Sequence, residues 1–83
     1  MQYEKVCVEI EAKFLKEGGV RPAAILWENG AKYPVERVKF IERAPARVSA
    51  ILPVRFTCII GGKEKFLWFE PELMRWFVEV KRE

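Results

Sequence analysis

The sequence predicts an all-β protein: a small, six-stranded, strongly bent antiparallel barrel. Apolar and charged residues alternate over short stretches, which is typical of half-buried strands. Glycines and prolines separate these stretches and indicate turns between them. Three tryptophans, two tyrosines and six phenylalanines supply the large side chains that a chain of 83 residues needs for its core. We expect one domain, residues 1–83.

The first half of the chain contains two predicted strands and a hairpin turn. Val6–Phe14 is the first strand, because apolar residues occupy its even-numbered positions and charged residues most of the odd ones. Glu17-Gly18-Gly19 then turns the chain into a second strand, Val20–Glu28. Asn29-Gly30 follows, and this dipeptide predicts a type I′ turn because both residues accept a positive φ.

The third predicted strand, Ala31–Glu42, changes its inward face along its length. Apolar residues fall on odd positions before Glu36-Arg37 and on even positions after it. A β-bulge there would re-aim the strand and help a sheet to curl into a barrel. The next segment, Arg43–Pro53, contains prolines and is predicted as a loop. Because OB-folds usually carry a helix between two strands, we prefer an SH3-like barrel, with an OB-like barrel as the alternative.

Three further strands are predicted: Val54–Ile60, Glu64–Glu70 and Arg75–Lys81, with a turn at Gly61-Gly62 between the first two. The strand Glu64–Glu70 is apolar on both faces, so the pattern does not decide which face is buried. The two alternative inward pairs are Phe66 with Trp68 and Leu67 with Phe69.

The composition argues against an enzyme. The chain contains neither histidine nor aspartate, which excludes serine–histidine–aspartate and cysteine–histidine schemes, histidine metal sites and aspartate-rich calcium loops. Glutamates of the predicted strands lie on outward positions among lysine and arginine, where solvated ion pairs are expected. Cys7 and Cys58 are expected to be reduced thiols, with Cys58 buried and unreactive. We therefore expect no catalytic residue, no metal site and no cofactor.

Charge and hydropathy give weaker indications. The formal net charge of +3 slightly favours an anionic partner. No apolar run approaches the ~20 residues of a membrane-spanning helix. The N-terminus lacks the basic and apolar regions of a signal peptide. We expect no membrane association and a cytoplasmic location.

From Trp27 onward the chain has a recognisable layout. It consists of a glycine turn, a Tyr-x-Val-x-x-Val strand at 33–38, an Arg-Phe pair at 55–56 and a closing Trp-Phe-Val strand at 76–78. This layout, over about two thirds of the chain, resembles short bacterial proteins of unknown function. More distantly, it resembles a domain appended to some bacterial Y-family DNA polymerases. The resemblance implies a β-barrel and a DNA-associated context, and it implies no catalytic residue.

Aromatic and basic residues form the candidate interaction surface. Trp27, Phe69 and Phe77 fall on phases that could point outward. A protein partner or a second copy of the chain could cover such an apolar surface. Alternatively, single-stranded nucleic acid could stack its bases on the aromatics beside cationic side chains. A third interpretation is that these aromatics pack beneath loops. The candidate residues are Trp27, Arg37, Arg55, Lys65, Phe69, Arg75 and Phe77.

Overall fold

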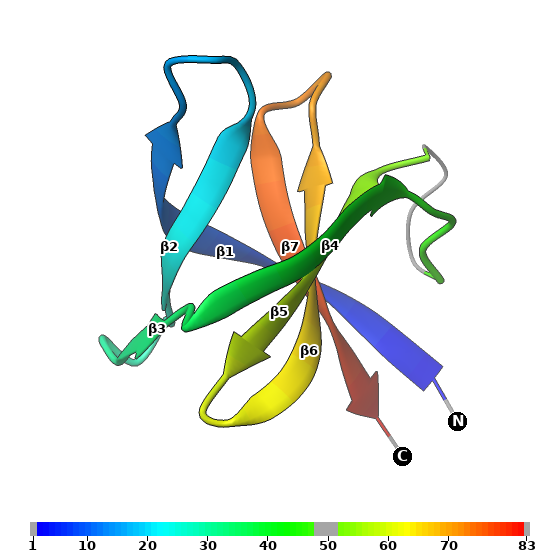
Figure 1. Ribbon diagram of the computed structural model, residues 1–83. Coiled ribbons are helices and arrows are strands. Elements are labelled where there is room, and N and C mark those ends of the chain that lie inside the picture. Colours follow the sequence, from blue (N-terminus) through cyan, green and yellow to red (C-terminus); the bar gives the residue numbers. More distant parts are fainter. Residues whose placement is uncertain (1, 48–51, 83) are drawn as a thin grey trace.

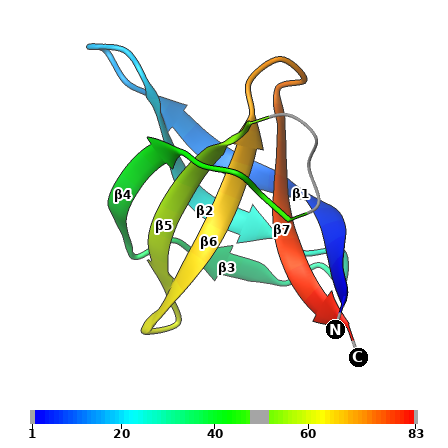
Figure 2. The same cartoon turned by 90° about the vertical axis from the view of Figure 1, so that its right-hand side faces the viewer.

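The computed structural model describes residues 2–47 and 52–82, and in these residues the chain forms one antiparallel sheet of seven strands, curled into a half-barrel (Figures 1 and 2). The strand order is β3-β2-β1-β7-β6-β5-β4. The all-β, antiparallel prediction is confirmed, but the predicted number of six strands is wrong. The strands are β1 (Gln2–Phe14), β2 (Val20–Leu26), β3 (Lys32–Pro34), β4 (Arg37–Arg43), β5 (Val54–Ile60), β6 (Lys63–Glu70) and β7 (Arg75–Arg82).

The additional strand arises because the predicted third strand is two strands, β3 and β4. They form the two edges of the sheet, β3 beside β2 and β4 beside β5. Val35, between them, donates its N–H to the carbonyl of Ala23 in β2 at 2.8 Å. Glu36 donates its N–H to the carbonyl of Ile59 in β5, also at 2.8 Å. The chain therefore passes from one edge to the other within two residues, at the phase change seen in the sequence, and the bulge lies further on, between Val38 and Phe40.

The turn at Asn29-Gly30 is present, but it is not of type I′. Gly30 donates its N–H to the carbonyl of Trp27 at 2.9 Å, and Trp27 donates its N–H to the carbonyl of Ala31 at 2.8 Å. Gly30 has a φ of 87°, whereas Asn29 is not among the described residues with positive φ. A three-residue loop of this kind needs one residue in the left-handed region, and Gly30 supplies it.

The inner face of the half-barrel carries the main core. Its buried members are Ile25, Phe56, Cys58, Ile60, Leu67 and Phe69. Trp76 of β7 packs on this cluster, with ring centroids 5.1 Å from Phe56 and 4.6 Å from Phe69. The question that the sequence left open is thereby answered, since Leu67 and Phe69 face inward. The end of β1 leaves the core, so Phe14, predicted to point inward, is 71% exposed.

A second apolar cluster lies on the outer face of β6 and β7. Trp68 and Phe77 stack there with ring centroids 6.0 Å apart and planes 7° from parallel. Ala44 and Ala46, in the segment after β4, pack on them. The predicted loop Arg43–Pro53 is non-strand at the described residues after Arg43, and its residues 48–51 lie outside the described part. Residues 67–70 of β6 are therefore buried on both faces of the sheet, whereas residues 63–66 are exposed.

Among the described residues, no helix is long and apolar enough to cross a membrane.

Candidate binding pocket between β6 and β7

Strands β6 and β7 separate before their ends. They pair only from Trp68 to Glu70 on β6 and from Arg75 to Phe77 on β7. The remainder of β6, residues 63–67, pairs with β5, and the remainder of β7, residues 78–82, pairs with β1. Figure 1 shows the two strands diverging below the centre of the sheet. The facing edges of β6 and β7 therefore lack a strand partner over these described residues.

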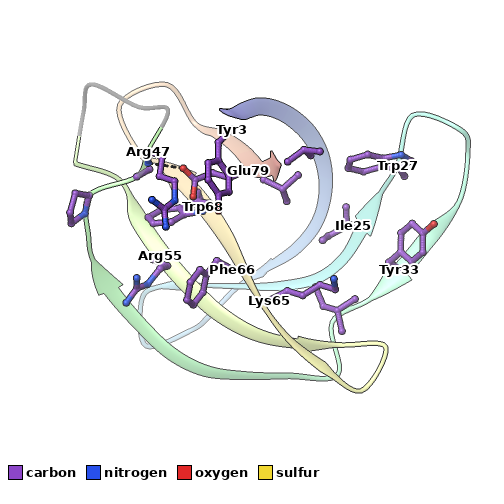
Figure 3. Close-up of a pocket in the computed structure, with 15 residues that line it drawn as sticks. Tyr3, Ile25, Trp27, Tyr33, Arg47, Arg55, Lys65, Phe66, Trp68 and Glu79 are labelled. Carbon is purple, nitrogen blue, oxygen red and sulfur yellow. Dashed lines mark hydrogen bonds between the residues drawn. The ribbon is translucent and has the colours of Figure 1, made fainter. Parts of the chain in front are cut away.

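A pocket of about 910 Å³ lies at this gap (Figure 3). Its lining includes consecutive residues of each strand: Lys65 and Phe66 on β6, and Val78, Glu79 and Val80 on β7. Successive residues of a strand point to opposite faces of a sheet. The pocket is therefore lined from both faces of the sheet. We call the part lined from the outer face the outer part and the part lined from the inner face the inner part, and the two parts meet at the gap.

The outer part is organised by two guanidinium groups that lie over aromatic rings. The Arg55 guanidinium carbon lies 4.5 Å from the ring centroid of Phe66 and 5.8 Å from that of Trp68. The Arg47 guanidinium carbon lies 4.6 Å from the ring centroid of Tyr3. These distances are within the range of cation–π attraction, which limits the rotation of both arginines.

Two carboxylates also hold this part of the site. Arg47 donates its backbone N–H to Glu79 Oε2 at 2.6 Å, which ties the segment after β4 to β7. Arg55 Nη2 lies 2.5 Å from Glu42 Oε1 on the neighbouring strand β4. The outer part thus presents arginines in defined positions.

The inner part is more apolar. Ile25, Ile60, Val78 and Val80 form much of its wall. Trp27 and Tyr33 stand at this end of the pocket, as Figure 3 shows, and Tyr33 is 44% exposed. The exposed Lys65 adds a cation here.

The lining has a positive balance of charge. Its described residues include three cations, Arg47, Arg55 and Lys65, and one acid, Glu79. One oxygen of Glu79 already accepts a hydrogen bond from Arg47. A ligand with negative charge is therefore favoured over a cationic one.

An ion cluster around one buried glutamate holds the paired ends of β6 and β7. Glu70, 1% exposed, lies at the end of β6. Its Oε2 is 2.8 Å from Lys5 Nζ on β1, and its Oε1 is 3.0 Å from Arg75 Nε on β7. Lys5 also lies 4.7 Å from the ring centroid of Phe77. These contacts join β1, β6 and β7 at the turn end of the paired segment, two residue pairs away from the point where β6 and β7 separate.

Three of the seven predicted surface residues, Trp27, Arg55 and Lys65, line the pocket. Arg37 begins β4, is exposed and is not among the lining residues, and Arg75 belongs to the Glu70 cluster. The expectation that Phe69 and Phe77 are exposed is wrong. Phe69 is 9% exposed because it faces the main core, and Phe77 is 0% exposed because it packs against Trp68 beneath the segment after β4.

Five aromatic or basic lining residues were not among the candidates: Tyr3, Tyr33, Arg47, Phe66 and Trp68. Apart from Phe66 and Trp68 of β6, they come from separate segments, and no spacing in the sequence links those segments. The adjacency of Lys65 and Phe66 was the one local signal, because a cation next to an aromatic residue is typical of nucleic-acid surfaces.

The thiols do not contribute a nucleophile to this pocket. Cys58 is 0% exposed in the main core, and burial raises its pKa from 9.0 to about 11. Cys7 is exposed on β1 and is not among the lining residues. In the part of the chain that the structure describes, no group of three potential metal-ligating side chains occurs.

Comparison of the chain with protein-family models, with curated proteins and with solved structures finds no match.

Proposed function

We propose that this protein is a non-enzymatic module that binds single-stranded nucleic acid in the pocket between β6 and β7. The observation that carries the proposal is the lining itself, in which aromatic side chains and three cations surround one space with a single, already bonded acid among the described residues. Single strands are bound without sequence preference by this combination of stacking rings and cationic side chains.

The two parts of the pocket suit the two components of a nucleotide. Trp27 and Tyr33, at the inner end, offer ring surfaces on which unpaired bases could stack. Arg47 and Arg55, at the outer end, offer guanidinium groups for phosphate oxygens. A volume of about 910 Å³ is in the range of ordinary ligand pockets and admits a segment of a single strand.

The hypothesis of a protein or self-association surface has less support. It depended on Trp27, Phe69 and Phe77, and the last two are buried. A different observation favours a protein ligand as the second candidate. The unpaired edges of β6 and β7 could accept an extended peptide as an added strand, bonded through its main chain.

We also infer that the half-barrel is of the SH3-like type. The passage from β3 to β4 within two residues supports this inference, as does the lack of a helix among the described strand connections. The distant resemblance to a polymerase-associated domain agrees with a nucleic-acid context.

A titration of a labelled 12-nucleotide oligothymidylate tests the proposed function. If two or three cations of the pocket contact phosphates, the slope of log K against log salt is about −1.4 to −2.1. Affinity should then fall about tenfold between about 50 and about 200 mM salt. Absence of binding at micromolar protein in low salt, or binding that is insensitive to salt, would contradict the proposal.

Variants locate the binding on the protein. Arg47→Gln should reduce the slope by about 0.7, because one of the phosphate contacts assigned to the outer part is lost. Lys16→Gln is the matched control, because it removes the same charge from the distant β1–β2 turn and should leave the slope unchanged. Tyr33→Ala should weaken binding by about 1–3 kcal/mol if a base stacks on the ring.

A displayed library of random peptides tests the second candidate. Peptides that are selected by the wild-type protein, and that protect the backbone amides of β6 and β7 from hydrogen exchange, would favour strand addition over nucleic-acid binding.

A further inference from the structure

Two buried hydrogen-bond donors at the pocket have no acceptor among the described residues. They are Arg55 Nε and the indole Nε1 of Trp68. Both residues line the pocket, and Trp68 is only 2% exposed. Buried polar groups in native proteins are nearly always bonded, because an unmet donor loses its bonds to water without replacement. Two buried donors without an acceptor beside the same pocket therefore require an explanation.

Packing holds both donors in place. The Trp68 indole is stacked on Phe77, and its ring meets that of Phe66 edge-on at 6.2 Å between centroids. The Arg55 guanidinium lies over Phe66 while its Nη2 is held by Glu42. Neither side chain can turn to another partner without losing these contacts. Both nitrogens have almost no solvent-accessible surface, so a ligand oxygen reaches them only when a neighbouring side chain moves aside.

The missing partner must be an acceptor, and its surroundings favour an anion. One donor is an indole, which donates only, and the other belongs to a guanidinium, which donates only and is always charged. Arg47 lines the same outer part of the pocket and adds a second positive charge. An oxyanion can accept a hydrogen bond from donors of this kind and is attracted by both arginines.

We propose that Arg55 Nε and Trp68 Nε1 form a subsite for a phosphate oxygen of the bound ligand. The inference rests on the proposed function, and it names the group that the outer part of the pocket binds. Glu42 is the internal competitor at this subsite, because its carboxylate already accepts a hydrogen bond from Nη2 of the same guanidinium. Phosphate binding and the Glu42 ion pair therefore share one arginine.

The direct test follows the assigned N–H resonances of Trp68 Nε1 and Arg55 Nε by NMR while inorganic phosphate is added at constant ionic strength. Both resonances should move and saturate as phosphate is bound. The indole resonance of Trp76 is the internal control, because Trp76 packs on the inner core and is absent from the pocket lining. Chloride and acetate are titrated in parallel.

Two variants test the geometry without removing a buried side chain. Arg55→Lys keeps the positive charge but removes Nε, so phosphate should no longer move the Trp68 resonance and oligothymidylate affinity should fall about tenfold. Glu42→Gln removes the competing carboxylate at a side chain that is 54% exposed, and should strengthen phosphate binding severalfold. If Arg55 had only a structural role, Glu42→Gln would not strengthen phosphate binding.

The outcomes separate this inference from the proposed function. Salt-dependent oligothymidylate binding with unmoved Trp68 and Arg55 resonances, and wild-type affinity in Arg55→Lys, would overturn the subsite and leave the function standing. Phosphate-induced shifts without oligothymidylate binding would support the subsite and overturn the function. Acetate shifts as large as those of phosphate would overturn the phosphate assignment and indicate the carboxylate of an acidic peptide.

Discussion

The buried thiol of Cys58 predicts a specific dependence of stability on pH. Cys58 is 0% exposed between strands of the main core, and its Sγ lies 3.6 Å from the carbonyl oxygen of Phe56, to which the thiol can donate. Burial raises the pKa of this thiol from 9.0 to about 11, because the thiolate would lose its hydration. The folded protein therefore holds the thiol proton more tightly than the unfolded chain.

The sign and the size of the effect follow from linkage. Because the folded pKa is raised, the contribution to stability is complete below about pH 9 and is lost as the pH rises through about 11. At pH 10 the loss is about 1.4 kcal/mol, and well above pH 11 it approaches about 2.7 kcal/mol, from a shift of about two pKa units.

The assay is urea unfolding of the wild-type protein and Cys58→Ala at several values of pH between 8 and 11. Lysines and tyrosines also titrate in this range, so the informative quantity is the difference in unfolding free energy between the two proteins. This difference should shift by about 1.4 kcal/mol in favour of Cys58→Ala between pH 8 and pH 10. Cys7→Ala retains Cys58 and should keep the wild-type slope. Parallel curves for wild type and Cys58→Ala up to pH 11 would refute the reasoning.

Two further predictions concern the packing around the pocket. Lys5→Met should destabilise the fold by about 1.5–3 kcal/mol, because it removes a charged hydrogen bond from the buried Glu70. Lys32→Met should cost less than about 1 kcal/mol, because the ion pair that it breaks, with Glu11, is half exposed on both sides. Equal costs in denaturant unfolding would contradict this ranking. Phe77→Ala should cost about 3–5 kcal/mol because the ring is fully buried, and Phe66→Ala, 45% exposed, should cost about 1 kcal/mol or less. Thermal unfolding of both variants measures the difference. A small loss of stability in Phe77→Ala would mean that the outer cluster of Trp68 and Phe77 is not tightly packed.

Much of the fold was predictable because local patterns encode it. Alternation identified the strand regions, and glycine pairs marked the turns, including Gly61-Gly62, where both φ angles are positive. The change of parity at Glu36-Arg37 was interpreted as a β-bulge, which is wrong, because the chain passes there from one sheet edge to the other and the bulge lies between Val38 and Phe40. The pattern could not distinguish a bulged strand from two strands, since both produce the same shift of parity.

The pocket was predictable only in part. Trp27, Arg55 and Lys65 were chosen as aromatic or basic residues on candidate outward positions, and all three line it. Tyr3 and Arg47 were missed, because they reach the pocket through pairings between segments far apart in the chain. The register of β1 with β7 places Tyr3, and a hydrogen bond to Glu79 places Arg47.

Strand β6, residues 63–70, shows which features the sequence determined and which features the tertiary structure determined. The sequence by itself determined that β6 is a strand and that both of its faces are apolar, because these properties depend on neighbouring residues alone. Only the tertiary structure decided what covers each face: the main core against Leu67, and the segment after β4 against Trp68. It also decided that β6 leaves β7 beyond Trp68, which opens the pocket. The reason is that the alternation of apolar and polar residues indicates which side chains are buried, whereas contacts between distant segments decide which residues cover them.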